Sequence, residues 1–450
     1  MELSLSQVAQ CLHLPAPASD VVISGWSIDS RTLTPGDLYF ALKGEVHDGH
    51  KFLAAAFEAG AAAAIAESSG SYILTVADSL KALQQLASCA RAQWNGTVVA
   101  VTGSAGKTST KDAIAHLLEI AMPVGRTVGN FNNHIGLPLS LLRMPADAKV
   151  AVLEMGMNHT GEIRALAAIA KPDIGVVTNV GYAHVEFFSS IEGIALAKRE
   201  LVESLPREGT AVLNFDDERV AQFRTVHTGS TLTYGFNAGA DVQAELLDST
   251  HFQCLGTTFE TQLTGKHAIS NIVAALAVAQ LFGLAPATLQ DAVASLAPGK
   301  MRGERTVHHE ITIFNDCYNS NPAAAHAMLR VLAAEPAKRR IAVLGEMLEL
   351  GNRTEPLHRD LGSQVAESGI DVLVSLRGAA RFTTEEAVKA GMSGGAAHFF
   401  EDPAQAGRYL KTIALPGDAI LFKGSRGVHV ERALEAFLAE TGSDTGGAAA

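Results

Sequence analysis

The chain has 450 residues, about three times the length of a typical domain, so we expect two or three domains. Hydrophobic residues make up 47% of the chain and charged residues 18%, a composition that is typical of a folded globular protein and argues against a disordered one. The net charge of −12 argues against the basic surface with which proteins bind DNA or RNA, so we expect no nucleic acid partner.

The cysteines and the N-terminus indicate the compartment. The four cysteines, Cys11, Cys89, Cys254 and Cys317, show no paired or metal-ligand spacing, which is typical of reduced cytosolic thiols. The N-terminal segment lacks the basic region and apolar run of a signal peptide. No stretch reaches the roughly 20 apolar residues that span a bilayer. We therefore expect a cytoplasmic protein without a membrane span, in which all four cysteines are reduced.

Two blocks of secondary structure can be separated in the first two thirds of the chain. The first, residues 1–82, combines short strands with an Ala-rich helix predicted over 52–64. A helical stretch over 80–93 leads to the second block, residues 83–300. Its strands are predicted at 97–101, 150–154, 174–179 and 211–214, and its helices at 162–170 and 191–205. This alternation predicts a parallel sheet with helices on both faces.

The composition shifts twice more towards the C-terminus. The segment 211–264 is richer in polar residues and predicts a small added β-meander, followed by a long helix over 268–281. APGKMRGERT, around 296–305, is typical of a linker. Strands and helices then alternate again, which predicts a second doubly wound α/β unit over 301–440, and the tail 441–450 is expected to be disordered. The predicted fold class is α/β with three domains.

A glycine-rich loop, VTGSAGKTSTKD, follows an apolar strand and opens a helix. Gly103 and Gly106 allow a tight turn whose N–H groups can surround phosphate oxygens at a helix N-terminus. Lys107 is placed to reach the β- and γ-phosphates of ATP, and Thr108 to put its hydroxyl on Mg²⁺. The first glycine of the usual Walker pattern would fall at Val101, and a plain strand–helix connection is the alternative. The predicted ATP-binding residues here are Thr102, Gly103, Ser104, Ala105, Gly106, Lys107, Thr108 and Ser109.

Two neighbouring strands end in residues that could bind a metal ion. Glu154 closes the strand AVLE, at the sheet edge that also carries the phosphate loop. An acidic residue at that place commonly holds Mg²⁺ or its water, and a surface carboxylate is the alternative. His184 follows the next strand, and alone it is more often a structural histidine than a ligand. Because both residues lie beside a nucleotide loop, we predict that they form part of a metal site.

Lys198 lies inside the apolar stripe of the helix predicted over 191–205, whereas Glu200 and Glu203 lie on the opposite side. A lysine that points inward must either extend its ammonium group to solvent or lose its charge, because desolvating an ammonium is costly. Extension to solvent is the usual outcome. A lowered pKa would instead make the amine reactive towards CO₂, and the carbamate product is an anionic oxygen ligand suited to Mg²⁺.

Together these residues resemble the Mur ligase family over nearly the whole chain. The resemblance implies a UDP-binding N-terminal domain, a central P-loop ATPase domain built on a parallel sheet, and a Rossmann-like C-terminal domain. It implies two Mg²⁺ ions at Glu154, His184 and carbamylated Lys198. It also implies that Asn271, in GKHAISNIVAALA, lies on the adenine side, although Ala268 replaces the usual asparagine there. An arginine of the linker, Arg302 or Arg305, would contact the γ-phosphate, and spacing does not choose between them.

The resemblance also implies substrate-binding residues. Those in DSRTLTPGDLYFALKGEVHDGH would bind the UDP group, and those in GNFNNHIGLP would lie near the phosphates. Three C-terminal segments, DCYNSNP, LGEMLELG and KGSRGVHVE, resemble the family members that add D-alanyl-D-alanine to a UDP-N-acetylmuramoyl-tripeptide. The implied substrate residues are Ser30, Arg31, Lys43, Gly44, Asn132, Asn133, His134, Tyr318, Asn319, Asn321, Lys423, Ser425 and Arg426.

The activity that the resemblance implies is ATP-dependent amide formation through an acyl phosphate, releasing ADP and phosphate, in peptidoglycan precursor synthesis by a monomer. The implied catalytic residues are Lys107, Lys198, His184 and Asp316. The base that deprotonates the incoming amine stays open among Asp316, His134 and His358. The alternative is the related ligase that adds a single diamino acid to the UDP-muramoyl-dipeptide. Its Asp-Asn-Pro-Arg motif is missing from this sequence. A P-loop kinase or mechanical ATPase is the rival from another class.

Overall fold

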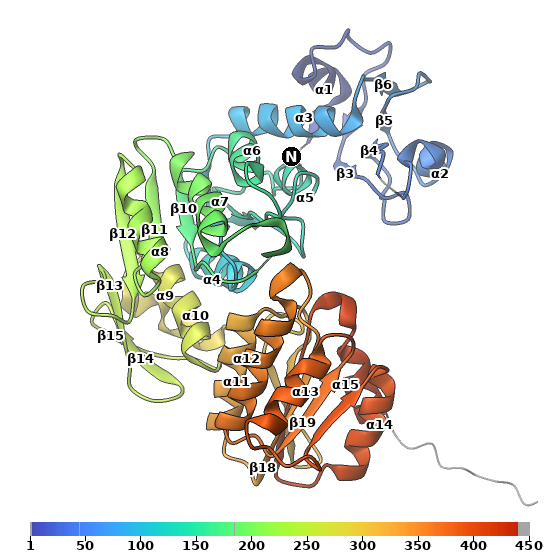
Figure 1. Cartoon of the computed structure of the whole chain (residues 1–450). Helices are drawn as coiled ribbons and strands as arrows, with labels where there is room; N and C mark the ends of the chain where they lie inside the picture. The colour runs from blue at the N-terminus through green and yellow to red at the C-terminus, as the bar shows by residue number, and fades with distance from the viewer. Residues whose placement is uncertain (1, 45, 184, 440–450) are drawn as a thin grey trace, which may run out of the picture. The chain divides into compact units, whose positions relative to one another are not determined.

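The computed structural model describes residues 2–44, 46–183 and 185–439. The chain forms two compact units, which are treated separately below. The first comprises the chain up to Val180, Ser190–Thr261 and Ser270–Leu296. The second comprises Gly181–Ser189, Gln262–Ile269 and the chain from Ala297 onward. Three larger sheets, of four, nine and six strands, organise the described residues (Figure 1).

The N-terminal sheet is parallel and has the order β3-β4-β5-β6. Its strands are β3 (Gly25–Ser27), β4 (Asp37–Phe40), β5 (Ala63–Ala66) and β6 (Ile73–Thr75). A small antiparallel pair, β1 (Leu3–Ser4) and β2 (Val22–Ile23), accompanies α1 (Leu5–Cys11). The helix predicted over 52–64 is wrong in its second half. The helix α2 (Leu53–Glu58) ends before Gly60, whose φ of 99° suits a turn, and the alanines beyond it form the buried strand β5.

Helix α3 (Ser79–Gln93) begins at Asp78, whose carboxylate accepts the Lys81 N–H at 2.9 Å. It packs against α5 (Gly136–Leu142), α6 (Glu162–Ala170) and α1, as the pale-blue helix of Figure 1 shows. Cys89 on α3 forms a disulfide with Cys11 on α1. The expectation of four reduced cysteines is therefore wrong for this pair. The two cysteines lie 78 residues apart in sequence, and the packing of α1 on α3 brings them together.

The nine-stranded sheet has the order β15-β14-β13-β12-β11-β10-β7-β9-β8. Its parallel part contains β7 (Thr97–Thr102), β8 (Val124–Arg126), β9 (Val150–Glu154), β10 (Ile174–Val177), β11 (Thr210–Asn214) and β12 (Ser230–Gly235). The antiparallel extension consists of β13 (Val242–Leu246), β14 (His251–Cys254) and β15 (Thr257–Glu260). The meander predicted from residue 211 therefore starts only after β12, because β11 and β12 belong to the parallel ladder.

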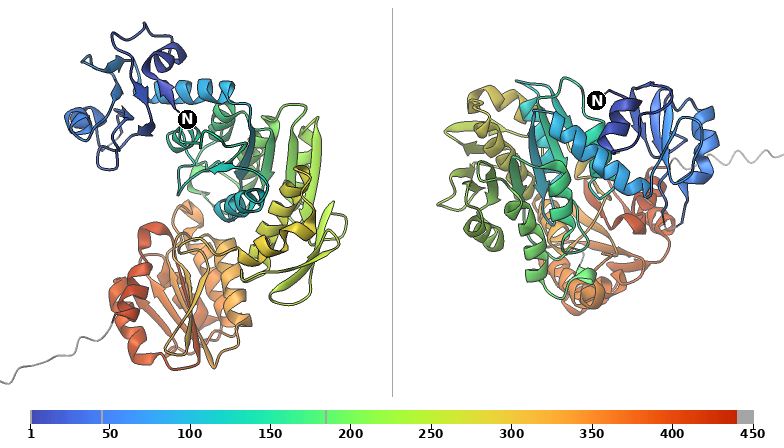
Figure 2. Two further views of the ribbon diagram at one scale, coloured as in Figure 1. Left: turned by 180° about the vertical axis from the view of Figure 1, so that it is seen from behind. Right: turned by 90° about the horizontal axis from the view of Figure 1, so that it is seen from above.

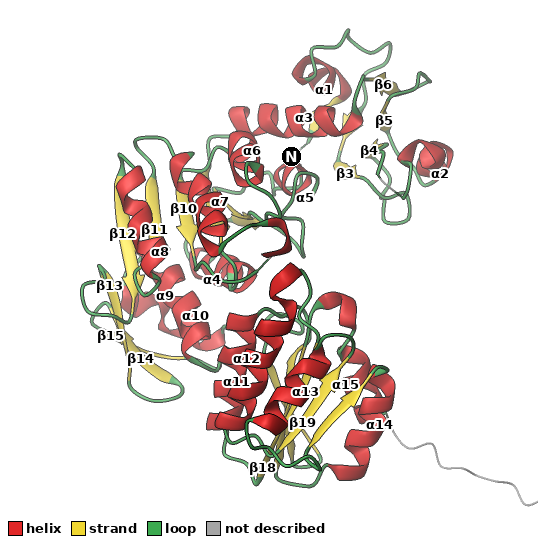
Figure 3. Ribbon diagram, viewed as in Figure 1, coloured by secondary structure: helices red, strands yellow, loops and turns green. Residues whose placement is uncertain are grey.

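Helices cover the parallel part of this sheet, as the red ribbons of Figure 3 show. They are α4 (Lys107–Leu118), α5, α6, α7 (Ile191–Glu203), α8 (Glu218–Gln222) and α9 (Lys266–Leu281). Helix α10 (Gln290–Ser295) packs against β15 of the antiparallel extension. The strands β7 and β9 are apolar along almost their whole length and are buried. Such continuous apolar runs are typical of central strands of a parallel sheet covered on both faces.

The six-stranded sheet of the second unit has the order β16-β17-β21-β18-β19-β20. Its strands are β16 (Glu304–His308), β17 (Ile311–Asp316), β18 (Arg339–Gly345), β19 (Val372–Leu376), β20 (Ala397–Phe400) and β21 (Asp418–Lys423). All pairs are parallel except β16–β17. Because β16 begins at Glu304, the predicted linker is wrong in its last residues. Strand β21 lies between β17 and β18, which makes this edge the topological switch point where α/β proteins commonly bind ligands.

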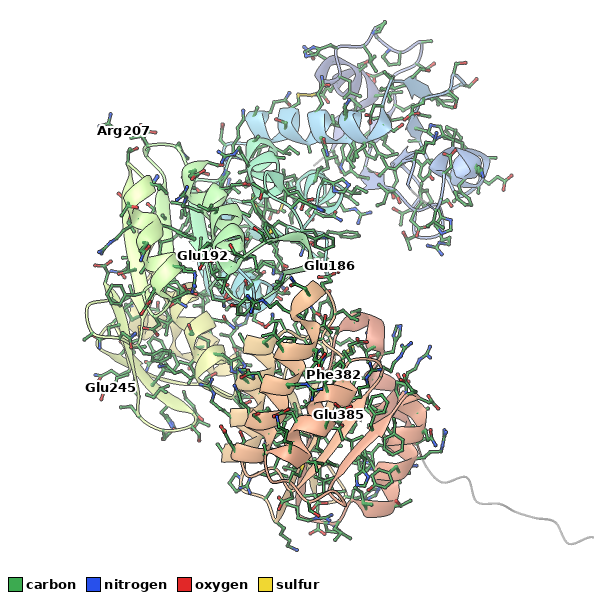
Figure 4. The ribbon with its side chains drawn as sticks, viewed as in Figure 1. Glu186, Glu192, Arg207, Glu245, Phe382 and Glu385 are labelled. Carbon is green, nitrogen blue, oxygen red and sulfur yellow. A yellow bond between two sulfur atoms is a disulfide. The ribbon has the colours of Figure 1, made fainter. Side chains whose placement is uncertain are left out.

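Helices cover both faces of this sheet (Figure 2). They are α11 (Pro322–Ala334), α12 (Thr354–Glu367), α13 (Ala380–Lys389), α14 (Pro403–Ile413) and α15 (Glu431–Leu438). On one face, side chains of α14 and α15 pack with Val343 and Phe422 of the strands in one hydrophobic core. Helices α12 and α13 also pack together. Arg359 of α12 hydrogen-bonds Glu385 and lies over the ring of Phe382, both labelled on α13 in Figure 4.

The predicted α/β class with a P-loop sheet and a Rossmann-like C-terminal sheet is confirmed. The domain bounds at 82/83 and 300/301 stay predictions, and the tail 441–450 lies outside the described residues. Among the helices of the described ranges, none has the length and apolarity needed to cross a membrane.

Candidate active site

The phosphate loop connects β7 to α4 and depends on glycine at two positions. Gly103 has φ 154°, and a Cβ there would lie 1.8 Å from the Thr178 hydroxyl. Gly106 has φ 79° and caps α4, and a Cβ there would lie 2.5 Å from Oδ1 of Asn271. Any larger residue would therefore displace the loop. The first N–H groups of α4, from Gly106 to Ser109, have no acceptor within the helix and are placed to bind phosphate.

Two residues at the end of the neighbouring strand β10 brace this loop, and the sequence analysis missed both. The Thr178 hydroxyl donates to the Ala105 carbonyl at 2.6 Å. The side-chain oxygen of Asn179 accepts the Ala105 N–H at 2.8 Å, and the backbone carbonyl of Asn179 accepts the Ser104 N–H at 3.0 Å. The N–H groups of Ser104 and Ala105 are thus bound to protein, so phosphate contacts are left to the helical end of the loop. The detectable signal was the Thr-Asn pair after an apolar strand beside β7.

Two lysines, Lys107 of α4 and Lys198 of α7, bring positively charged side-chain groups to this site. Lys107 donates to the Gly103 carbonyl at 2.9 Å. Lys198 of α7 is only 2% exposed, and no hydrogen bond or ion pair joins its ammonium group to another described residue. Burial, assisted by the charge of Lys107, holds the pKa of Lys198 well below its usual value. Extension of Lys198 to solvent, the usual outcome weighed from sequence, is therefore wrong.

Glu154 lies at the carboxyl end of β9 and is only 3% exposed, so the alternative of a surface carboxylate is wrong. Its Oε2 accepts the Thr108 hydroxyl at 2.7 Å, and its Oε1 accepts the Asn132 amide at 2.7 Å. Carboxylate and hydroxyl oxygens at this separation fit the coordination shell of Mg²⁺. The arrangement supports the predicted metal role of Thr108 and Glu154. His184 lies outside the described residues.

Glu200 lies on the same helix as Lys198 and was expected on the solvent-facing side of that helix. This prediction is wrong. It is buried, and its two carboxylate oxygens accept the N–H groups of Gly161 and Arg164 at 2.7 and 3.1 Å. These groups belong to the N-terminus of α6, where a negative charge is favourable. Helix α7 therefore holds Lys198 towards the phosphate loop and is itself tied to α6.

The other predicted residues around the phosphate loop differ in role. The Asn132 side chain donates to Glu154, whereas the Asn133 side chain accepts the N–H groups of Ile135 and Gly136 in the turn that leads into α5. The carbonyl of His134 accepts the Gln84 amide, and the residue is exposed. Asn271 accepts the Thr110 hydroxyl and packs against Gly106, so it supports the loop.

The predicted UDP-binding residues follow two adjacent parallel strands. Ser30 and Arg31 come after β3, and Lys43 and Gly44 come after β4, so both segments start at the same sheet edge. The side chain of Arg31 is 85% exposed and forms two hydrogen bonds with Asp29. These bonds lower the pKa of Asp29 to about 2. Gly44 donates its N–H to His47 in a turn. The edge is thus accessible to an anionic ligand.

In the second unit, Asp316 and Lys423 face each other at the ends of β17 and β21. Their side chains form an ion pair of 2.5 Å, and Lys423 also donates to the Asn319 carbonyl at 3.0 Å. Lys423 is only 2% exposed. Since its carboxylate neutralises a buried lysine, Asp316 has a structural partner, which argues against its role as the base.

Ser425 joins the three C-terminal segments. Its hydroxyl donates to the Ser320 carbonyl at 3.3 Å and accepts the Leu348 N–H at 3.0 Å. Nearby, the buried His358 accepts the Met347 N–H at Nε2 and contacts the Thr354 carbonyl through Nδ1. Burial lowers the pKa of His358, and its Nε2 acts as an acceptor. Both ring nitrogens are engaged, which makes His358 a support of the LGEMLELG segment and a poor base.

The two linker arginines are placed differently. The Arg302 guanidinium lies 3.8 Å from the centre of the Tyr318 ring, whereas Arg305 forms an ion pair of 2.5 Å with Glu335, the residue that follows α11. Asn319 accepts the Ser320 N–H, Asn321 caps α11, and Arg426 pairs with Glu431. Only Arg302 of the two arginines is held without an acidic partner among the described residues.

A strand–glycine loop–helix site with Lys107, Thr108 and Glu154, on a parallel sheet, defines a P-loop nucleotide-binding α/β protein. Family comparisons give a narrower result. The chain matches the Mur ligase family catalytic domain over residues 22–125, the Mur ligase middle domain over 101–279, and the Mur ligase glutamate ligase domain over 301–426.

Individual relatives agree. The UDP-N-acetylmuramoyl-tripeptide–D-alanyl-D-alanine ligase of Bacillus subtilis is 38% identical, over 91% of this chain and 92% of that protein. A crystal structure of MurF from Acinetobacter baumannii aligns with TM-score 0.87 and 30% identity, over 97% of this chain and 98% of that one. MurF ligase from Thermotoga maritima in complex with ADP aligns with TM-score 0.82 and 32% identity, over 92% and 97%. The chain belongs to the Mur ligase family and is a ligase, as predicted.

Proposed function

We propose that the chain joins the amine of D-alanyl-D-alanine to the peptide carboxylate of a UDP-N-acetylmuramoyl-tripeptide, using ATP. The observation that carries this proposal is the bridging of DCYNSNP, LGEMLELG and KGSRGVHVE by one side chain, Ser425, at the switch point of the C-terminal sheet. These segments resemble those of the family members that add D-alanyl-D-alanine. Support also comes from the Bacillus subtilis relative, which carries that activity in its name.

The first unit supplies the phosphoryl-transfer half of the reaction. The N–H groups from Gly106 to Ser109 and the Lys107 ammonium hold the phosphates of ATP. Thr108 and Glu154 would hold Mg²⁺, with His184 and Lys198 as predicted ligands of a second ion. When bound, Mg²⁺ neutralises charge on the phosphates and on the incoming carboxylate. Of the two linker arginines, we propose Arg302 for the γ-phosphate, because Arg305 is paired with Glu335.

Lys198 is suited to carbamylation because its amine is buried and its pKa is lowered. The neutral amine adds to the carbon of CO₂ and releases one proton to solvent, which leaves a carbamate. The carbamate also places a negative charge beside the positively charged Lys107, which is a favourable interaction.

The reaction proceeds in two steps. The peptide carboxylate attacks the γ-phosphorus of ATP, and the bond to the ADP oxygen breaks, which gives an acyl phosphate. The amine of the dipeptide then attacks the acyl carbon, loses a proton, and expels phosphate. We propose that the dipeptide binds at the carboxyl edge of β17, β21 and β18, and that the enzyme acts as a cytoplasmic monomer.

The direct test uses the full chain with ATP, Mg²⁺ and a UDP-N-acetylmuramoyl-tripeptide. ADP release should require D-alanyl-D-alanine, and the product mass should increase by that of the dipeptide minus water. Parallel reactions with lysine- and diaminopimelate-containing tripeptides determine the preferred third residue. Activity with a single amino acid on the UDP-muramoyl-dipeptide, and none with D-alanyl-D-alanine, would favour the alternative ligase. ATP turnover without any peptide would favour a kinase or mechanical ATPase.

A further inference from the structure

Lys111 carries a buried positive charge one helical turn beyond Lys107 on α4. Its side chain is only 3% exposed. A buried ammonium group is tolerated only when it is paired and hydrogen-bonded. Lys111 meets both conditions, because its Nζ donates to the Thr127 carbonyl at 2.6 Å and pairs with Asp112 at 2.7 Å. The side chain therefore links the phosphate-loop helix to the residue that follows strand β8.

Thr127 is fully buried and is held in three ways. Its N–H donates to the Val152 carbonyl at 3.1 Å, and its hydroxyl accepts the Glu154 N–H at 3.1 Å. Its carbonyl accepts the Lys111 ammonium. Thr127 thus fixes the backbone of Glu154 from one side while Lys111 fixes Thr127 from the other.

Thr127 also begins the loop that delivers Asn132 to Glu154. The Asn132 amide donates to Oε1 of Glu154 at 2.7 Å, and the Asn132 carbonyl accepts the Gly156 N–H at 2.9 Å. Helix α4 therefore reaches Glu154 by two routes. One is direct, through the Thr108 hydroxyl, and the other passes through Lys111 and Thr127.

We propose that Lys111 is a positioning residue that sets the carboxylate of Glu154 for a divalent cation. This inference rests on the proposed function, because it assigns Glu154 to the metal site of that reaction. A methionine at position 111 would fill nearly the same volume, yet it could not donate to the Thr127 carbonyl and would leave Asp112 without its partner. Position 111 therefore requires a side chain that is charged and donates a hydrogen bond, and a side chain of equal volume is not sufficient.

The first experiment compares Lys111→Met with Lys149→Met. Lys149 precedes β9 in the same sheet and is exposed, so it serves as the matched control. Mn²⁺ is the probe, and its dissociation constant is measured by electron paramagnetic resonance in the presence of a non-hydrolysable ATP analogue. Lys111→Met should weaken Mn²⁺ binding about 10- to 100-fold, the range typical of partners that orient a metal ligand. Lys149→Met should leave it unchanged. Unchanged Mn²⁺ binding in folded Lys111→Met overturns the proposal.

A second pair of variants acts on the same route without touching the lysine. Thr127→Ser keeps the hydroxyl that accepts the Glu154 N–H, and Thr127→Val removes it. Thr127→Val should weaken Mn²⁺ binding and speed hydrogen exchange at the Glu154 amide, whereas Thr127→Ser should do neither. Equal behaviour of the two variants overturns the proposal even if Lys111→Met fails to fold. Failure of the proposed function is distinguishable, because the unmodified chain would then bind Mn²⁺ and release no ADP with D-alanyl-D-alanine.

Discussion

The phosphate-loop site of the first unit and the switch-point edge of the second unit handle charge in opposite ways. In the first, Lys107 and Lys198 lie close enough for their charges to interact, and Lys198 pairs with no described residue. In the second, Lys423 pairs with Asp316, Arg305 with Glu335 and Arg426 with Glu431. The first site presents the Lys107 ammonium and the N-terminal N–H groups of α4 to a polyanion such as ATP. The second is neutralised internally, which suits a zwitterion such as a dipeptide.

Among the substitutions considered, replacement of Lys198 should reduce the activity of the phosphate-loop site most strongly. Lys198→Ala should lower the rate of ADP release on the order of a thousandfold, because it removes a group proposed to stabilise the transferring charge. Added short carboxylic acids should restore part of the rate by supplying the missing anionic oxygen. Arg199→Ala is the matched control, since Arg199 is on the same helix and pairs with Glu203. Full activity of Lys198→Ala would contradict the carbamate role.

The disulfide should contribute to the stability of the first unit alone. Cys11 and Cys89 close a loop of 78 residues, which predicts a loss of about 4 kcal/mol in the free energy of unfolding when Cys11→Ser removes the bond. Alkylation of the unfolded chain without reductant should label Cys254 and Cys317 only, as measured by mass spectrometry. Labelling of all four cysteines in the unfolded, unreduced chain would show that the bond does not form in solution.

The stability of the second unit should depend on the ion pair between Asp316 and Lys423. Asp316→Asn leaves the buried Lys423 ammonium without its counter-charge, so we expect a loss of about 3 kcal/mol in the free energy of unfolding. Urea denaturation measures this. The ion pair that the exposed Lys389 forms with Glu386 is the control, because Lys389→Ala should change the free energy of unfolding by less than about 1 kcal/mol. Equal effects of the two substitutions would contradict the view that charge neutralisation shapes this edge.

The lowered pKa of Lys198 predicts a dependence of stability on pH. In CO₂-free buffer the unfolded chain binds more protons than the folded chain between the lowered pKa of Lys198 and the ordinary lysine pKa of 10.5. The free energy of unfolding should therefore rise as the pH increases between these two pKa values. Below the lowered pKa, the folded chain must carry a buried charged lysine, which is unfavourable. Lys198→Met should remove this rise. The same slope in both proteins would mean that other groups cause it.

Ser425→Ala should have the smallest effect on stability, about 1 kcal/mol, because one hydroxyl with two partners is lost. Its effect on the reaction should be specific. The KM for D-alanyl-D-alanine should rise while the KM for ATP stays constant, since Ser425 connects segments of the switch-point edge only. A change confined to the KM for ATP would contradict this separation of roles.

The sequence was informative wherever chemistry follows local pattern. The phosphate loop follows from Gly103, Gly106 and Lys107, and helical periodicity placed Lys198 inside the fold. Periodicity failed for Glu200, because the face of a single helix does not reveal that another helix begins beside it. It also failed beyond Gly60, where an Ala-rich run becomes a buried strand.

Long-range pairings were the second limit. Nothing in the spacing of Cys11 and Cys89 reveals that α1 packs on α3, and nothing near Lys111 reveals Thr127 as its acceptor. Spacing also could not choose between Arg302 and Arg305, whereas the ion pair of Arg305 with Glu335 distinguishes them. Such partners depend on tertiary packing, and a sequence motif carries no record of it.

The central claim is that the buried Lys198 is carbamylated, and carbon-13 NMR of the enzyme equilibrated with labelled bicarbonate tests it directly. The account predicts a carbamate resonance that is present in the unmodified chain and in Arg199→Ala, and absent in Lys198→Ala. No such resonance in the active enzyme, or one that persists in Lys198→Ala, would contradict it.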